Sequence, residues 1–186
     1  MNGDGHEHAT GLRIRAAVVT VSDKGYAGKR EDSSGPALRD LLLEMGAEVG
    51  EPRLVPDEQD LIEAVLRDLA DGGGVDLVLT TGGTGLAPRD RTPEATLAVI
   101  DRLAPGFPEA MRAASAAITP HAMLSRATAG VRGATLIINM PGSPKACREH
   151  FAVIARSLPH AVETLTGQAY ECAAPPPPPP LPLGPG

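Results

Sequence analysis

The sequence predicts an α/β fold with a parallel sheet and helices on its faces. Two observations lead to this prediction. Short, mainly apolar runs occur at Ala16–Val21, Leu77–Leu79 and Thr135–Asn139, as expected for strands buried on both faces. Between them lie longer segments whose apolar residues recur at helical spacing. Alternation of strands with amphipathic helices is typical of parallel sheets.

The length and composition indicate one folded domain between two terminal extensions. We expect a polar, flexible leader over residues 1–12, the domain over 13–170 and a disordered, proline-rich tail over 171–186. The leader lacks the apolar segment of a signal peptide. A polyproline tail suits an SH3-like groove, although this composition favours an extended segment without a partner.

Charge and composition exclude several classes of function. The net charge of -6 argues against nucleic-acid binding, which favours a basic surface. No apolar run reaches the length of a membrane span, so we expect a cytoplasmic protein without membrane contact. Cys147 and Cys172 lie in no Cys-x-x-Cys pattern, and the histidines lack ligand spacing. A disulfide or transition-metal site is therefore not expected.

The first strand ends in two polar residues. Ser22 and Asp23 follow Ala16–Val21, at the carboxyl end where open parallel sheets bind ligands. A turn cap is an equally good interpretation of this Ser-Asp pair. A polar, glycine-containing loop is expected over residues 24–32.

A helix, a strand and a second helix follow this loop. The first helix begins at Ser34 and stops at Gly46, and the strand is expected over Glu48–Val55. Asp57 is placed to cap the second helix, which glycines 72–74 end. The apolar stripe of this helix consists of Leu61, Ile62, Val65, Leu66 and Leu69.

The central stretch, Leu77–Arg91, reads LVLTTGGTGLAPRDR. It joins a buried strand to a glycine-rich loop, after which Thr92 and Pro93 are expected as the N-cap and first-turn proline of a helix. Strand, glycine loop and helix start together form an anion site, because free N–H groups and the helix dipole converge. The alternative is a tight turn without a ligand.

Two known phosphate loops do not match this stretch. A P-loop ends in Gly-Lys-Ser/Thr, whereas Gly85 is followed by Leu86 and Ala87. A dinucleotide fingerprint starting at Gly83 would place its last glycine at Pro88.

The second half of the chain continues the alternation. Helices are expected over Pro93–Leu103 and Glu109–Ile118, followed by an irregular stretch over residues 124–133. After the strand at Thr135–Asn139 comes a small-residue loop, Met140–Pro144. Lys145 then begins a long helix whose inner stripe contains Phe151, Ile154, Leu158, Val162 and Leu165.

Three predicted strand ends share the same edge of the sheet, so their loops are expected to meet in one crevice. They are Ser22–Asp23, Thr81–Gly85 and Pro141–Ser143.

Several longer motifs run through the domain. They are VSD at Val21–Asp23, VPDE at Val55–Glu58, TTGGTGLAPRDRTPEAT at Thr80–Thr96, LSR at Leu124–Arg126 and INMPGSP at Ile138–Pro144. On these motifs, Arg15 to Gly167 resembles the molybdopterin adenylyltransferase family, which includes single-domain bacterial enzymes and the G domain of gephyrin-type proteins. The short segment after Lys145 looks more like the gephyrin-type domain.

The resemblance implies a three-layer α/β/α fold with a mostly parallel sheet, usually a homotrimer, that adenylylates molybdopterin with Mg-ATP. By position, it implies that Asp57 and Asp90 are the catalytic pair and the Mg²⁺ ligands. It also implies a molybdate-insertion protein as a possible partner. The residues expected to bind substrate are Ser22, Asp23, Thr81, Gly82, Gly83, Thr84, Gly85, Pro141, Gly142 and Ser143.

These residue types suit the implied chemistry. Two phosphorylated substrates repel each other, and a magnesium ion held by carboxylates, with N–H donors from glycine loops, offsets that repulsion. Local positive charge would come from Lys145 with Arg89, Arg91 or Arg126, although ordinary surface solvation is the better interpretation of Arg91. For both aspartates, the alternative is a cap or turn residue.

Three other functions stay open. The first is a molybdopterin-binding protein without catalysis, and the second is molybdate insertion by the related domain. The third, a nucleotide-dependent oxidoreductase, is disfavoured by the failed dinucleotide fingerprint.

Overall fold

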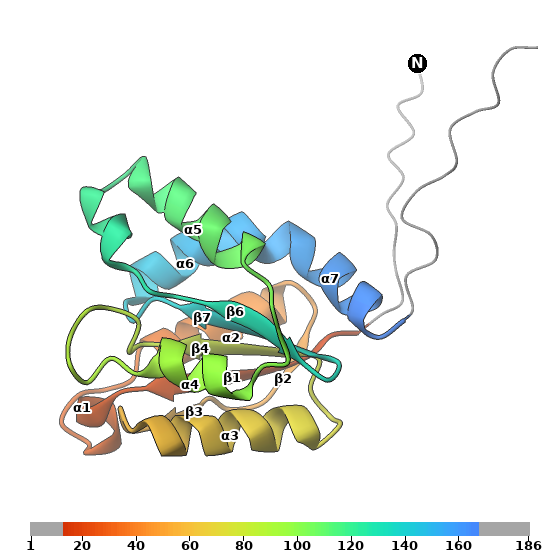
Figure 1. Cartoon of the computed structure of the whole chain (residues 1–186), viewed down its shortest axis with the longest axis horizontal. Helices are drawn as coiled ribbons and strands as arrows, with labels where there is room; N and C mark the ends of the chain where they lie inside the picture. Colours follow the sequence, from red (N-terminus) through yellow and green to blue (C-terminus); the bar gives the residue numbers. More distant parts are fainter. Residues whose placement is uncertain (1–12, 168–186) are drawn as a thin grey trace, which may run out of the picture.

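The computed structural model describes residues 13–167 and confirms the three-layer fold (Figure 1). The expected leader, the tail and Cys172 lie outside the described residues. The sheet has seven strands in the order β2-β1-β4-β7-β6-β5, with β3 also paired to β1. The strands are β1 Arg15–Val21, β2 Glu48–Val49, β3 Arg53–Val55, β4 Leu77–Thr81, β5 Arg102–Leu103, β6 Ala129–Arg132 and β7 Thr135–Met140.

The mostly parallel character of the sheet is also confirmed. Strands β1, β2, β3, β4 and β7 are parallel, whereas β6 runs antiparallel to both β7 and β5 at one edge. The central strand β4 is buried throughout, because it lies between β1 and β7 and is covered on both faces. This double burial explains the apolar run Leu77–Leu79, and the hydroxyls of the buried Thr80 and Thr81 take part in hydrogen bonds to Asn139 and Pro141.

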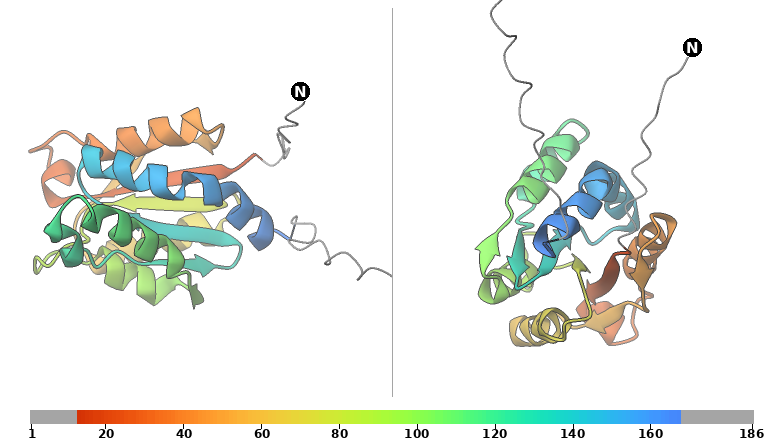
Figure 2. Two further views of the ribbon diagram at one scale, coloured as in Figure 1. Left: turned by 90° about the horizontal axis from the view of Figure 1, so that it is seen from above. Right: turned by 90° about the vertical axis from the view of Figure 1, so that its right-hand side faces the viewer.

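The helices form two layers, visible on either side of the sheet in Figures 1 and 2. One layer contains α2, α5, α6 and α7, and the other contains α3 and α4. The helical segments are α1 Asp23–Tyr26, α2 Ser34–Glu44, α3 Gln59–Asp71, α4 Thr92–Val99, α5 Gly106–Ala116, η1 Pro120–Leu124, α6 Pro144–Ile154, η2 Ala155–Ser157 and α7 Leu158–Leu165.

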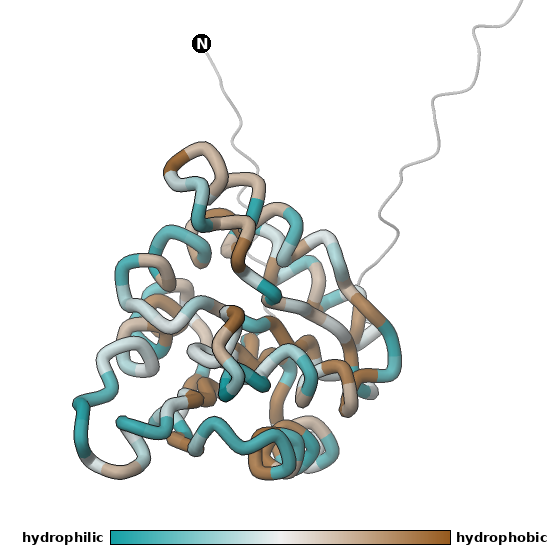
Figure 3. The backbone as a smooth tube through the Cα atoms, turned by 60° about the vertical axis from the view of Figure 1, so that its left-hand side comes forward, coloured by the Kyte–Doolittle hydropathy of each residue, from teal (hydrophilic) through white to brown (hydrophobic). Residues whose placement is uncertain are grey.

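Each face of the sheet has its own hydrophobic core. On one face Leu38 and Leu42 of α2 pack with Phe151 of α6, and on the other Ile62 and Leu66 of α3 pack beneath the sheet. Figure 3 shows the complementary pattern, with hydrophilic stretches in loops at the edge of the molecule. The structure contains no helix capable of spanning a membrane between residues 13 and 167.

Several predicted element boundaries were wrong. The strand expected over Glu48–Val55 is two short strands, because the chain breaks at residues 50–52, where Pro52 has no N–H to donate. The helix expected to reach Leu103 ends at Val99, and Leu103 lies in β5. The irregular stretch over residues 124–133 begins at the last residue of η1 and contains β6.

Three helical segments also differ from the predictions. The long helix from Lys145 begins at Pro144 and is interrupted by η2, before Pro159 in the first turn of α7. The polar loop over residues 24–32 begins as the short helix α1. In α3, Leu61 is exposed instead of lying in the inner stripe.

The predictions that Asp57 caps α3 and that Thr92 caps α4 were both wrong. Helix α3 has Glu58 at its N-cap position, and the Asp57 carboxylate instead accepts a hydrogen bond from the Asp23 N–H. Helix α4 begins at Thr92, whose hydroxyl donates back to the Gly82 carbonyl. Both side chains therefore bind neighbouring loops across the site.

Candidate functional site

A cavity of about 370 Å³ opens at the carboxyl ends of β1, β4 and β7. The predicted convergence of three loops is therefore confirmed. Seven of the expected site residues line it: Ser22, Asp57, Gly82, Gly83, Asp90, Gly142 and Ser143. The sequence reasoning missed Thr20, Val21, Gly25, Arg30, Glu31, Asp32, Ser33, Ser34 and Pro144 as lining residues.

Ser22 has both of the roles considered for it. It lines the cavity and is also the N-cap of α1, where its Oγ accepts a hydrogen bond from the Gly25 N–H at 3.1 Å. This contact turns the chain sharply after β1 and exposes the pocket-facing backbone.

The glycine loop approaches the rest of the site too closely for larger residues. Gly82 has φ +96, and a Cβ there would clash with the Val21 carbonyl oxygen. At Gly83 the added Cβ would clash with Thr92 Oγ1 and would lie 3.2 Å from Asp57 Oδ1. The loop backbone therefore lies directly against the first strand end and the Asp57 carboxylate.

Asp57 is a partly buried carboxylate with one free oxygen. Its Oδ2 accepts the Asp23 N–H at 2.7 Å, whereas its Oδ1 accepts no hydrogen bond from any residue within 13–167. Burial raises the pKa of the Asp57 carboxyl, and the charges of Asp23 and Asp90 raise it further, against the lowering effects of the Asp23 N–H and Arg89. An unpaired carboxylate in this setting favours a cation.

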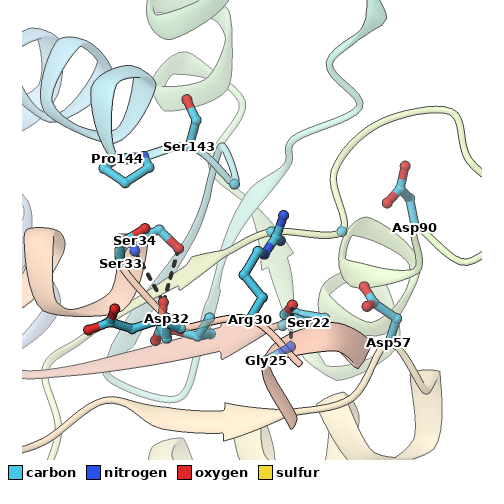
Figure 4. A pocket seen from close by; sticks show the side chains of 16 residues that line it. Ser22, Gly25, Arg30, Asp32, Ser33, Ser34, Asp57, Asp90, Ser143 and Pro144 are labelled. Carbon is cyan, nitrogen blue, oxygen red and sulfur yellow. Dashed lines mark hydrogen bonds between the residues drawn. The ribbon is translucent and has the colours of Figure 1, made fainter. Parts of the chain in front are cut away.

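Asp90 lies beside Asp57 on the same side of the cavity (Figure 4). Its Oδ2 accepts the Ala87 N–H at 2.9 Å, so it is a turn residue as well as a cavity residue. Arg126 holds this turn in place by donating to the carbonyls of Gly85, at 2.7 Å, and Asp90, at 2.6 Å.

The two carboxylates suit a magnesium ion that takes only one or two of its ligands from the protein. Within residues 13–167 there is no cluster of three or more His, Cys, Asp or Glu residues able to form a metal cage. Mg²⁺ in phosphoryl-transfer sites uses one or two carboxylates, with phosphates and waters as its other ligands. Asp57, with its free Oδ1, and Asp90 supply that donor set.

Two helix N-termini reach the cavity. Ser143 caps α6 by accepting the Ala146 N–H, and Asp32 accepts N–H groups from Ser34 and Gly35 at the start of α2. Asp32 also accepts from the Thr20 hydroxyl at 2.7 Å. An acidic residue two or three positions before a Ser-Gly-Pro helix start was the sequence signal that could have identified it.

A second cavity of about 290 Å³ shares the glycine loop. Three expected site residues, Thr84, Gly85 and Pro141, line this second cavity instead of the first. Its other lining residues are Arg112, Ser115, Thr119, His121, Ala122, Leu124, Ser125, Ala146, Glu149 and His150. Nothing in the sequence indicated that the expected residues divide between two compartments.

Ser115 and His150 form the main polar contact in the second cavity. Ser115 Oγ lies 2.5 Å from His150 Nε2, while His150 Nδ1 is buried without a hydrogen-bond partner in the described structure. Burial lowers the pKa of His150, which keeps the imidazole neutral near pH 7.

Two expected substrate-binding residues line neither cavity. Thr81 is fully buried and donates to the Pro141 carbonyl at 2.7 Å, which joins the β4 and β7 strand ends. Asp23 faces Arg89, whose Nε and Nη2 lie 3.0 and 2.9 Å from its oxygens. Both residues support the site without lining it.

The candidate basic residues have different surroundings. Arg89 pairs with Asp23 and Glu58, and Arg126 pairs with Glu94. Lys145 is highly exposed, and its Nζ lies 3.8 Å from Glu149 Oε1. Arg91 is also exposed, in agreement with the interpretation of this residue as an ordinary solvated surface residue. Arg30, a basic residue that was not expected in the site, lines the first cavity (Figure 4).

Comparisons with known proteins identify the family to which the chain belongs. Residues 17–160 match the family described as a probable molybdopterin binding domain. The molybdopterin adenylyltransferase of Helicobacter pylori J99 is 44% identical over 156 residues, which cover 83% of this chain and 89% of the relative. The Escherichia coli K12 protein of the same name is 41% identical over 175 residues, covering 86% and 89%.

Solved structures show the same likeness. The molybdopterin biosynthesis enzyme MoaB of Thermus thermophilus is 51% identical with a TM-score of 0.79, covering 85% of this chain and 99% of that chain. A Mog protein from Mycobacterium ulcerans is 35% identical with a TM-score of 0.78, covering 84% and 99%.

Proposed function

The chain belongs to the molybdopterin-binding domain family, and from this membership we propose that it is a molybdopterin adenylyltransferase of molybdenum cofactor biosynthesis. It transfers AMP from ATP to the terminal phosphate of molybdopterin. A phosphate oxygen of molybdopterin attacks the α-phosphorus of ATP, a phosphoanhydride bond forms, and pyrophosphate leaves. The products are adenylyl-molybdopterin and pyrophosphate.

One observation carries this proposal beyond family membership. Asp57 and Asp90 come from distant parts of the chain and line one cavity against the glycine loop, which is also a wall of a second cavity. Holding two reactants close together and aligned lowers the barrier to their reaction, and two cavities that share one loop suit this arrangement. The shared loop, Gly82–Gly85, lies at that meeting point.

The chemistry of each wall favours one substrate in each cavity. The first cavity combines Asp57 and Asp90 with the starts of α2 and α6, which suits a magnesium-bound triphosphate. The exposed surface of the second cavity is mainly apolar, and its wall also carries hydroxyl and imidazole groups with Arg112 and Glu149, which suits a flat heterocycle that forms hydrogen bonds. We therefore assign ATP to the first cavity and the pterin to the second.

The chain's own residues position the reactants. Asp57 and Asp90 would hold Mg²⁺, which neutralises phosphate charge when bound. Backbone N–H groups of the glycine loop and of Gly142 and Ser143 are available to phosphate oxygens, and Arg30 adds a positive charge. No covalent enzyme intermediate is required, since the attacking group belongs to the substrate.

The direct test is to incubate the protein with Mg-ATP and molybdopterin and to measure adenylyl-molybdopterin and pyrophosphate. Product formation that stops on addition of EDTA and returns with Mg²⁺ would support the proposal. Retention of pterin without ATP consumption would identify a non-catalytic binding protein instead. Molybdate-dependent release of AMP from adenylyl-molybdopterin would support molybdate insertion, and reduction of a nicotinamide cofactor would support an oxidoreductase.

We further propose a cytoplasmic homotrimer whose product passes to a molybdate-insertion protein. Exposed apolar side chains at Ile118, Met123 and Leu124, near the second cavity, support a subunit contact there. Light scattering should give a mass near three times that of one chain, and a monomer would refute the assembly.

A further inference from the structure

Asp23 and Asp57 are joined by a reciprocal pair of hydrogen bonds. The Asp23 N–H donates to Asp57 Oδ2 at 2.7 Å, and the Asp57 N–H donates to Asp23 Oδ1 at 3.0 Å. Each carboxylate is therefore oriented by the backbone of the other residue. The contact links the end of β1 to the segment that follows β3, across 34 residues of sequence.

Arg89 extends this link to the loop that carries Asp90. Its guanidinium donates to both Asp23 oxygens, at 3.0 and 2.9 Å, and its Nη1 lies 2.8 Å from Glu58 Oε1. Arg89 therefore binds both Asp23, which contacts Asp57 in space, and Glu58, which follows Asp57 in the sequence. Because Arg89 directly precedes Asp90, these contacts restrain Asp90 relative to Asp57.

The side chains of Asp23 and Arg89 bind each other and their neighbours, and neither residue lines a cavity. Both Asp23 oxygens are engaged by Arg89, and one of them also accepts the Asp57 N–H. Neither Asp23 nor Arg89 is among the residues that line the two cavities. Asp23 contacts Asp57 directly and Arg89 precedes Asp90 in the sequence, so the pair is placed to act through these two aspartates.

We propose that Asp23 and Arg89 are positioning residues that fix the relative placement of the Asp57 and Asp90 carboxylates without touching either substrate. This inference rests on the proposed transferase function. It revises the expectation that Asp23 binds substrate and that Arg89 supplies charge to the phosphates.

The pair is exposed enough for this role to be separated from folding. The side chains of Arg89 and Asp23 are 53% and 42% exposed, and exposed ion pairs contribute little to stability. Loss of the pair should therefore leave a folded protein. Displacement of reacting groups by about 1 Å, by contrast, can lower a rate by about 10²-fold.

The experiment compares Arg89→Ala with Arg91→Ala, a matched control that removes the same charge two residues away. We expect Arg89→Ala to lower kcat by about 10- to 100-fold with little change in KM for ATP, whereas Arg91→Ala stays near wild type. Arg89→Lys should not restore kcat, because an ammonium cannot form the same fork with Asp23 and Glu58. A direct phosphate contact would instead raise KM and be partly rescued by lysine, and that result would overturn the inference.

A double-mutant cycle tests the coupling between the two residues. Asp23→Ala should lower kcat to a similar extent, and the double variant Asp23→Ala/Arg89→Ala should be little worse than either single variant. Independent, additive losses would contradict a shared role.

Hydrogen exchange gives a readout that does not depend on catalysis. In the protein without nucleotide, the amides of residues 85–91 should exchange faster in Arg89→Ala than in Arg91→Ala. If wild-type protein forms no adenylyl-molybdopterin, the proposed function fails while the exchange result still tests the restraint. If wild-type protein is active but both arginine variants match it in kcat and exchange, only the positioning role fails.

Discussion

Replacing Asp57 by asparagine should abolish activity while making the fold slightly more stable. The substitution keeps the side chain's shape and an oxygen that can accept the Asp23 N–H, now at 2.7 Å from Oδ2. It removes a negative charge that is partly buried and lies near the charges of Asp23 and Asp90. If Asp57 serves to bind a metal ion, Asp57→Asn should therefore stabilise the fold. If Asp57 is a structural turn residue, the same substitution should destabilise it.

The sign follows from the pKa of Asp57, which burial raises in the folded state. The fold thus favours the protonated carboxyl, and the stability that protonation contributes is lost as pH rises through the folded pKa. At neutral pH the ionised side chain opposes folding, and asparagine removes that opposition. Because solvent screens this partly exposed site, we expect a gain of at most about 1 kcal/mol, or roughly 2–4 °C in Tm for a chain of this length.

The assay pairs thermal unfolding with AMP transfer. Asp57→Asn should reduce turnover by at least about 10²- to 10³-fold, the scale found when one preorganised charge-stabilising group is removed. The stability gain should shrink as the pH is lowered through the folded pKa, because wild-type Asp57 then becomes neutral as well. A lower Tm together with unchanged turnover would refute the reasoning and make Asp57 a structural residue.

Three further experiments test the glycine loop, the contact between Asp76 and Arg15, and the burial of Cys147. Gly83→Ala should destabilise the protein in urea by more than Gly28→Ala, since both glycines have positive φ (+62 and +66) but only the Gly83 Cβ meets Thr92 Oγ1; equal losses would exclude the steric argument. Asp76→Asn should cost about 2 kcal/mol at neutral pH, because the buried carboxylate accepts three hydrogen bonds from Arg15. Those bonds to Arg15 lower the pKa of Asp76, so its contribution is lost as pH falls through the folded pKa, and the gap to wild type should close in acid; a gap that stays constant below about pH 3 would contradict the assignment. Burial raises the pKa of the Cys147 thiol to about 11. In the Cys172→Ala variant, which leaves Cys147 as the remaining cysteine, a thiol reagent near neutral pH should therefore react only after urea is added. Rapid labelling of the native variant would contradict this expectation.

The sequence was most informative where one physical requirement determined the residue types. Leu77–Leu79 of strand β4 had to be apolar because the strand is buried on both faces, and Gly82 and Gly83 had to lack a Cβ because the Val21 carbonyl and Thr92 lie so close. These requirements are visible in the residue types themselves, so the buried strand, the glycine loop and the shared crevice could be predicted. The cap assignments failed because Asp57 and Thr92 form hydrogen bonds to residues distant in sequence, where local propensity carries no information.

The same distinction explains which site residues could be assigned. Asp23 belongs to a motif at a strand end, and sequence alone cannot tell whether such a residue faces a ligand or an arginine 66 positions away. Its two oxygens are engaged by Arg89, so its contribution to any reaction depends on how well it holds Asp57. On this proposal, the motifs of this chain include residues that build the site as well as residues that touch substrate. The kcat-against-KM comparison of Asp23 and Arg89 variants is what separates these two groups.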